Sequence, residues 1–220
     1  MHIFDVPYPI AVIASVIILD FLIWGQHLLF HNVPVLWRLH AVHHADRDLD
    51  VSSGGRFHPV EILLSMLIKF MAIACIGAPA VAVILFEIIL NATAMFNHSN
   101  VALPGWLDKI VRRVIVTPDM HRIHHSVHPD ETNSNYGFNL SIWDKLFGTY
   151  TQDPRDGQEN MEIGLSQFQA EHQTIWLPGM LSLPFNFTPS ASDSSESDVP
   201  GVERSSQDNA NIENNKQDKE

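Results

Sequence analysis

Residues 62–90 read ILLSMLIKFMAIACIGAPAVAVILFEIIL, an apolar run interrupted by only two charged residues, Lys69 and Glu87. As one helix the run would extend about 43 Å, because an α-helix rises 1.5 Å per residue. A bilayer has a hydrocarbon core of about 30 Å, so one straight span would have to tilt steeply. The run therefore predicts a membrane segment that is either kinked or divided.

The sequence Gly77-Ala78-Pro79 lies near the middle of this run and favours a break, since proline cannot continue a helix. Two short helices, roughly 61–76 and 79–94, would form a hairpin, although a single kinked span also fits the composition. Groups of histidines precede and follow the run. If they share one site, both ends of the run must lie on one membrane face, which only the hairpin allows.

A second apolar segment, residues 9–30, contains one carboxylate, Asp20, and no lysine or arginine. Its length matches a membrane-spanning helix. It lacks the basic start and the small-residue cleavage site of a signal peptide. The alternative is a buried helix of a soluble protein, which the longer apolar run at 62–90 disfavours.

Composition excludes several classes of protein. The 220 residues carry 25 acidic and 13 basic side chains, a net charge of −12, which argues against a nucleic-acid partner. The single cysteine, Cys75, excludes an internal disulfide and a thiolate-rich metal site. Residues 190–220 are polar and acidic and are predicted to be a disordered tail, so residues 1–189 would form the one domain.

The basic residues all follow the first span, which predicts that the histidine-bearing regions and the C-terminus face the cytoplasm. Seven of these 13 residues lie in the histidine-bearing regions: Arg38, Arg47, Arg56, Lys109, Arg112, Arg113 and Arg122.

The chain has 13 histidines, and most of them fall into three groups. The groups are His27-x-x-x-His31, His40-x-x-His43-His44 and His121-x-x-His124-His125. Residues three or four apart share a helix face, so each group can direct imidazoles at a common point. Imidazole is a ligand for zinc, copper, iron and nickel. Two further histidines, His58 and His98, lie between the groups.

A single His-x-x-His pair is weak evidence for a metal site, but three groups on one membrane face are strong evidence. Eight or nine histidines exceed the needs of one ion and imply two metals. Iron in such a cage beside a bilayer would suit oxidation of a lipid C–H bond with dioxygen. The sequence has no serine-hydrolase elbow, phosphate loop or dinucleotide motif that would favour other chemistry.

Together with further motifs, these groups resemble the fatty acid hydroxylase / sterol desaturase superfamily of membrane di-iron oxygenases, and bacterial sterol desaturase family proteins in particular. The resemblance covers about residues 20–150. The further motifs are Arg56-Phe-His58-Pro59-x-Glu61, Asn97-His98-Ser99-Asn100, Asn135-Tyr136-Gly137 and Trp143-Asp144-x-Leu146-Phe147-Gly148-Thr149-Tyr150.

The resemblance implies an all-α integral membrane protein with a transmembrane helix, a helical hairpin and a cytosolic, histidine-rich cap that holds two iron ions. Dioxygen would be the co-substrate, and a lipid C–H bond would be hydroxylated or desaturated. The catalytic metal ligands would be His27, His31, His40, His43, His44, His121, His124 and His125. His98 would be an additional metal ligand. His58 would be structural or an outer partner, and Asp119 and Asn135 would orient ligand imidazoles.

The resemblance also implies partners and a location. The substrate would be a membrane lipid, with sterols, fatty acyl chains, carotenoids and ether lipids all open. Electrons would come from a separate protein, because no haem-binding domain is visible. A multi-pass protein of the bacterial inner membrane is expected, with its oligomeric state open. Family members usually have more helices before the first histidine group, so the chain would be a short member, a fragment or a late-start gene product.

Two rival functions and two packing questions stay open. The chain could be a histidine-rich membrane protein that binds or transports metal, although transporters place their ionisable ligands within the membrane. It could also be a truncated, non-catalytic relative.

Residues 143–150 would pack against the cap or lie at the membrane interface, and the aromatic residues 176–187 would be interfacial.

Overall fold

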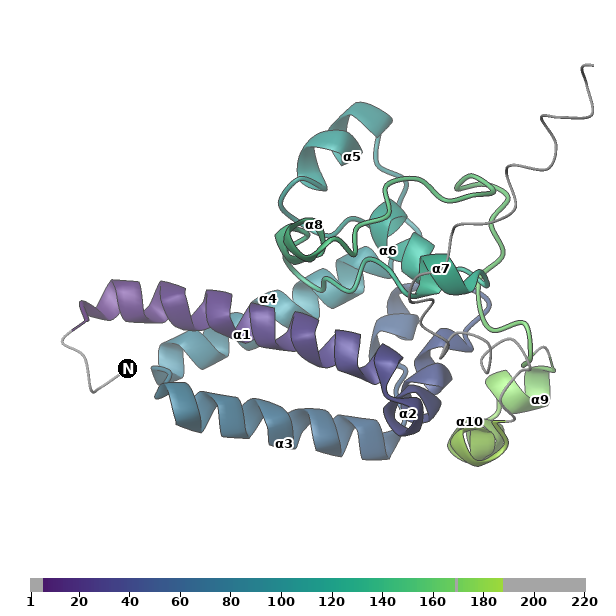
Figure 1. Ribbon diagram of the computed structural model, residues 1–220, viewed down its shortest axis with the longest axis horizontal. Helices are drawn as coiled ribbons and strands as arrows, with labels where there is room; N and C mark the ends of the chain where they lie inside the picture. Colours follow the sequence, from purple (N-terminus) through teal and green to yellow (C-terminus); the bar gives the residue numbers. More distant parts are fainter. Residues whose placement is uncertain (1–5, 169, 188–220) are drawn as a thin grey trace, which may run out of the picture. The chain divides into compact units, whose positions relative to one another are not determined.

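Three long apolar helices and a set of short ones make up the described part of the chain (Figure 1). The computed structural model describes residues 6–168 and 170–187. Within these residues the secondary structure is helical, and pairing between extended segments is limited to the bridges Ile115–Leu140 and Ser126–Ile163. The all-α prediction is confirmed, while the predicted tail at 190–220 lies outside the described residues.

The three long helices are each long and apolar enough to cross a membrane, and they are α1 (Tyr8–Asn32), α3 (Pro59–Ile76) and α4 (Ala80–Asn97). The short helices are α2 (Pro34–His44), α5 (Gly105–Val111), α6 (Pro118–His124), α7 (Pro129–Thr132), α8 (Ile142–Phe147), α9 (Glu171–Thr174) and α10 (Leu177–Ser182). Two 3-10 turns complete the set, η1 (Val51–Gly55) and η2 (Leu183–Phe185).

The run at 62–90 forms the predicted hairpin. α3 ends where Gly77 adopts a left-handed conformation, with φ 60° and ψ 48°, and the Gly77 N–H bonds to the carbonyl of Ile73. Pro79 then caps α4. α4 continues to Asn97, three residues beyond its predicted end, so that His98 follows directly on its last turn.

Replacing Gly77 by alanine is expected to destabilise the hairpin by about 1–2 kcal/mol, since a Cβ strains a left-handed residue. Unfolding of the micelle-bound protein in an SDS titration, followed by circular dichroism, measures this loss. Gly25→Ala is the matched control, because Gly25 lies within α1 with no neighbouring atom within 4 Å of an added Cβ. That variant should be unchanged or slightly more stable. Equal stability of the two variants would contradict the role of Gly77.

α1 packs against α2, α3 and α4, and a small apolar core lies at these contacts. Leu19 and Ile23 of α1 meet Phe86 of α4 there. The outer faces are apolar and exposed: only 6% of the apolar window of α3 is buried. A soluble protein would bury these faces, so the exposed apolar surface supports a membrane protein over the alternative of a buried soluble helix.

The segment after residue 142 packs against α1 through a reciprocal pair of hydrogen bonds. Trp143 Nε1 donates to Asp20 at 2.7 Å, and Trp24 Nε1 donates to Asp144 at 3.0 Å. Phe147 stacks on Trp24 with ring centroids 4.7 Å apart. Residues 143–150 therefore contact α1, and their place against the cap or at the membrane interface stays a prediction.

The last of the described residues, in and after η2, pack against α2. Leu183 and Phe187 bury their side chains against Ala41 and Val42 of α2. Other apolar side chains of this segment, including Trp176, stay exposed. Their location at a membrane interface stays a prediction.

Candidate metal centre

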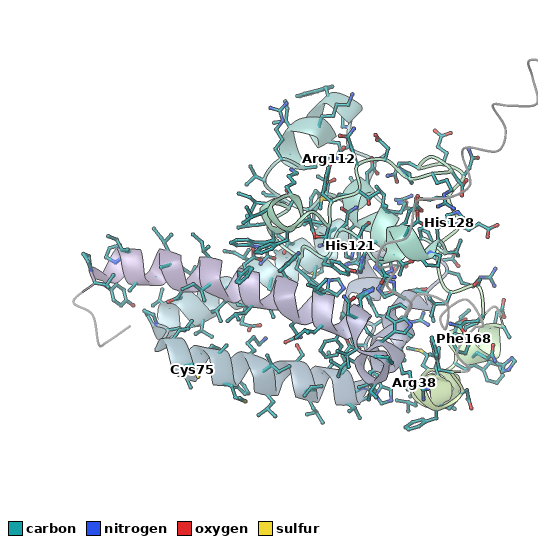
Figure 2. The ribbon with its side chains drawn as sticks, in the orientation of Figure 1. Arg38, Cys75, Arg112, His121, His128 and Phe168 are labelled. Carbon is teal, nitrogen blue, oxygen red and sulfur yellow. The ribbon has the colours of Figure 1, made fainter. Side chains whose placement is uncertain are left out.

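The nine predicted ligand histidines come from four parts of the chain and converge at the C-terminal end of α1. They lie in the last turns of α1 and α2, directly after α4, and in α6 with the residue that follows it. None is more than 8% exposed. Figure 2 shows His121 among the short helices and Cys75 at the hairpin end of α3, remote from His121.

The histidines form two groups that could each hold a metal ion, and within each group the ligand atoms lie within 4.8 Å of one another. The first group is His27, His31, His40, His44 and His124, and the second is His43, His98, His121 and His125. The groups adjoin, since the rings of His44 and His125 stack with centroids 4.5 Å apart. All nine predicted residues are brought together, including His98, and their role as ligands stays a prediction.

Each of the two His-x-x-His-His motifs contributes two histidines to one group and one histidine to the other, and the two motifs differ in which group receives two. In α2 the pair His40 and His44 joins the first group, and His43 joins the second. In α6 the pair His121 and His125 joins the second group, and His124 joins the first. Residues four apart are stacked on one helix face, whereas the residue between them points to one side. Each motif therefore bridges the two groups.

Backbone carbonyls fix the tautomer of three imidazoles. The Nδ1–H groups of His27, His124 and His98 donate to the carbonyl oxygens of Tyr136, Ser134 and Ala94, each at 2.7 Å. A carbonyl oxygen can only accept a hydrogen bond, so Nδ1 carries the proton in each ring. Nε2 then presents a lone pair.

The Nε2 atoms face one another at hydrogen-bond distance. His27 Nε2 lies 3.0 Å from His124 Nε2, and both rings have their proton on Nδ1. Two lone pairs at this distance repel unless a cation lies between them. In the second group His98 Nε2 lies 3.0 Å from His121 Nε2. The pair of His27 and His124 thus fits a cation held between the two rings better than a hydrogen bond between them.

Two further observations support this fit. Among the described residues, the buried Nε2 atoms of His31 and His44 have no hydrogen-bond partner. Burial lowers the pKa of His124 to about 3 and that of His98 to about 4. Burial likewise lowers the pKa of His121 well below its usual range. These three imidazoles are therefore neutral at neutral pH, which is the form that binds a metal.

Glu61 orients His40. The sequence motif at residues 56–61 includes Glu61 but did not indicate this contact. Glu61 Oε1 accepts from His40 Nδ1 at 2.6 Å, and the Glu61 residue is only 5% exposed. Asn133 lies beside His31, with its Oδ1 at 3.4 Å from His31 Nδ1. Outer partners of this kind hold a ligand imidazole in place and strengthen its basicity.

Three sequence predictions about outer residues have different outcomes. Asn135 was expected to orient an imidazole, and this is wrong: its amide donates to the carbonyls of Met120 and Thr151. Asn135 thus holds the backbone of α6. The expected partnership of Asp119 is also wrong, because no imidazole among the described residues bonds its carboxylate. His58 is structural, because its Nδ1 accepts from the Val60 N–H and caps α3.

Removing the Glu61 carboxylate is expected to weaken metal binding about 10- to 100-fold, as the loss of an outer partner does in metal sites. Glu61→Gln should lose less than Glu61→Ala, since the amide oxygen still accepts from His40. Chelator competition on the iron-loaded protein measures both. Asp130→Ala is the control, because Asp130 is an exposed carboxylate paired with Arg155. If Glu61→Ala binds iron as tightly as this control, Glu61 has no such role.

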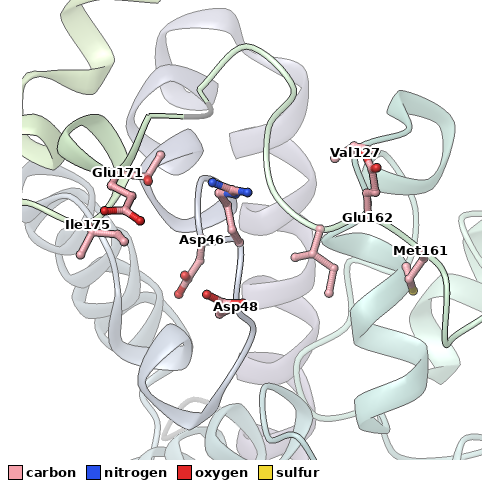
Figure 3. A pocket seen from close by; sticks show the side chains of 10 residues that line it. Asp46, Asp48, Val127, Met161, Glu162, Glu171 and Ile175 are labelled. Atoms are coloured by element: carbon pink, nitrogen blue, oxygen red, sulfur yellow. The ribbon is translucent and has the colours of Figure 1, made fainter.

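A cavity of about 360 Å³ reaches the first histidine group from between the long helices. His27 and His40 lie at one end, and apolar side chains such as Ile23, Met66 and Leu90 line its walls. We call this cavity the slot. A larger cavity of about 530 Å³ is lined by acidic residues including Asp46, Glu162 and Glu171, and contains none of the nine histidines (Figure 3).

Comparison with known proteins finds relatives that act on lipids. The chain is 34% identical to the ornithine lipid hydroxylase OlsE of Rhizobium tropici over 158 residues, which cover 71% of this chain and 46% of that protein. It is 28% identical to human alkylglycerol monooxygenase over 131 residues, covering 60% and 28% of the two chains. It is 24% identical to human cholesterol 25-hydroxylase over 141 residues, covering 60% and 47%.

The chain thus aligns with less than half the length of each of these relatives. No solved structure matches it. These relatives are hydroxylases and monooxygenases of lipids. A lipid-oxidising enzyme also agrees with the histidine groups and the long apolar helices of this chain. The sequence model of the fatty acid hydroxylase family matches residues 12–149, a stretch that contains all nine histidines. The resemblance in the sequence is therefore confirmed, and this chain belongs to the fatty acid hydroxylase family.

Proposed function

We propose that the chain oxidises a membrane lipid with dioxygen at a centre of two iron ions, one in each histidine group. The observation that carries this proposal is that the slot between the long apolar helices reaches one of two groups of closely spaced histidines. The lipid C–H bond would be hydroxylated or desaturated. Because the chain spans less than half of its relatives, the activity of the whole protein is part of the proposal.

The residues of the chain would hold the metals and orient the substrate. The nine histidines would be the ligands, and Glu61 and the carbonyls of Tyr136 and Ser134 keep the protons on Nδ1 so that Nε2 is free to bind. When bound, iron would supply the activation of dioxygen that an unactivated C–H bond requires. His27 and His40 line the slot, so the lipid would meet the first group. The apolar side of the slot, with Ile23, Met66 and Leu90, would exclude water from the reacting carbon.

The stoichiometry requires a source of electrons. Hydroxylation consumes dioxygen, two electrons and two protons, and yields one hydroxyl group and one water. Desaturation consumes the same reactants, removes two hydrogens from the lipid and yields two waters. In this proposal a separate donor protein supplies the electrons.

We also propose that the protein crosses the membrane several times, with the histidines on the cytoplasmic side. Arg38, Arg47 and Arg56 lie on the histidine side of the membrane helices, and positive residues favour the cytoplasm. A bacterial inner membrane would be the location.

Lipid extracts from cells that express the full chain under isotopically labelled dioxygen test this function. A labelled hydroxyl in a lipid, absent from cells with empty vector, supports hydroxylation. Loss of two hydrogens without label supports desaturation. Cells whose lipids are unchanged but whose metal content rises with expression would overturn the proposal in favour of a metal carrier.

A further inference from the structure

Polar side chains follow one face of α3, although this helix is otherwise apolar. Glu61, Ser65 and Lys69 are four residues apart and therefore lie in one row. All three line the slot. Lys69 lies about 12 Å along the helix from Glu61, because each residue adds 1.5 Å. The row thus runs from the histidines deep into the membrane segment.

The facing helices contribute matching polar groups. Gln26 of α1 donates to Ser65 at 2.7 Å, and Lys69 pairs with Glu87 of α4 at 2.6 Å. Asn91 follows Glu87 by one turn and also lines the slot. Two buried oxygens on the slot wall, Gln26 Oε1 and Glu61 Oε2, have no hydrogen-bond partner among the described residues. One side of the slot is therefore polar over its length.

Helix packing does not require the pair of Lys69 and Glu87. Charged residues in a membrane segment are costly and generally mark a functional site. Apolar residues of similar size pack as well as a buried ion pair or better. The side chain of Lys69 is 13% exposed and that of Glu87 is 36% exposed, and both residues line the slot. Recognition of a ligand would explain why the pair is present.

The pair matches one kind of chemical group. The ammonium has further N–H donors, and the carboxylate has further acceptor lone pairs. A neutral group that both donates and accepts a hydrogen bond, such as a hydroxyl or a secondary amide, satisfies both partners. A free carboxylate would place a second negative charge beside Glu87. A hydrocarbon would offer no hydrogen bond to the remaining donors of Lys69 or the remaining lone pairs of Glu87.

We propose that Lys69 and Glu87 bind a hydroxyl or amide group of the lipid, with Lys69 about 12 Å along α3 from Glu61, the residue that contacts His40. This inference rests on the proposed function, since it concerns the substrate of the same site. The pair then selects neutral polar lipids over free fatty acids, and its distance from the histidines determines which carbon lies beside them.

A binding experiment tests this without requiring turnover. A long-chain alcohol with a mid-chain diazirine is photocrosslinked to the full chain in detergent, and octadecanol, stearate and octadecane compete. Octadecanol should compete at least about tenfold better than the other two, since a hydrogen bond to a charged group contributes about 1.5–3 kcal/mol. Adducts should map to α1, α3 or α4 residues that line the slot.

Three variants separate recognition from structure. With the K69M/E87L variant, octadecanol and octadecane should compete equally well against the crosslinked alcohol. The Glu87→Gln variant should show an intermediate preference for octadecanol. R155M/D130L removes an exposed ion pair in the same way and should keep the wild-type preference.

An unchanged preference in K69M/E87L, adducts outside the slot, or a wild type without preference for the alcohol would each overturn the inference. Failure of the proposed function would appear separately, as unchanged lipids in the expression experiment.

Discussion

His124→Ala is expected to abolish lipid oxidation and to lower the iron content of the purified protein, while the chain still inserts in the membrane. His124 is fully buried, its Nδ1 is held by the Ser134 carbonyl, and its Nε2 faces His27. Loss of a ligand should exceed the roughly 10- to 100-fold effect of losing an outer partner. Product analysis and metal analysis on the same preparation measure both effects.

Two companion variants make this result specific. His121→Ala removes a ligand of the second group and should also abolish product. His128→Ala changes a histidine only a few residues away, whose ring is partly exposed and paired with Asp156, and should keep iron and activity. Undiminished product from His124→Ala would refute the assignment of the first group.

Asp144→Ala is expected to destabilise the folded protein by about 4 kcal/mol or more, because it leaves four donors without their partner and each buried one costs about 1–3 kcal/mol. The Asp144 carboxylate is fully buried and accepts from Trp24 Nε1, from the backbone N–H groups of Tyr136 and Gly137, and from the Thr149 hydroxyl. It therefore joins α1 to the loop whose carbonyls hold two ligand imidazoles.

The SDS titration of the micelle-bound protein measures this stability. Asp144→Asn should retain part of it, since one oxygen still accepts. Asp153→Ala is a matched control, because Asp153 is exposed. Because the Tyr136 carbonyl holds His27, the Asp144→Ala protein should also bind iron more weakly. Stability equal to that of Asp153→Ala would show that the four hydrogen bonds contribute little.

The membrane helices were predictable because length and apolar composition determine them locally. The break at Gly77 followed from glycine and proline chemistry, and α3 and α4 formed almost as expected. The histidine groups were also predictable, since spacings of three and four residues are a local helical property. His98 is isolated in the sequence, and the resemblance to a family is what added it to the predicted metal ligands.

The division of the histidines between two groups could not be predicted, because it depends on how α2 and α6 face each other. The acceptors for Nδ1 are equally non-local: the carbonyl that holds His27 belongs to Tyr136. Backbone carbonyls carry no sequence signal, and for this reason Asn135 was assigned a role that it does not have. Glu61 and Lys69 were a missed signal, since polar residues four apart in an apolar helix are visible in the sequence.

Iron bound per chain is the most direct test of a two-metal centre. The protein is purified in detergent, stripped of metal and reloaded with ferrous iron without oxygen, because zinc would otherwise outcompete iron. Wild-type protein should bind about two irons per chain, as expected for two groups with four or five imidazoles each. His121→Ala and His124→Ala should each bind less. At most one iron in the wild type, or full loading in both variants, would contradict the account.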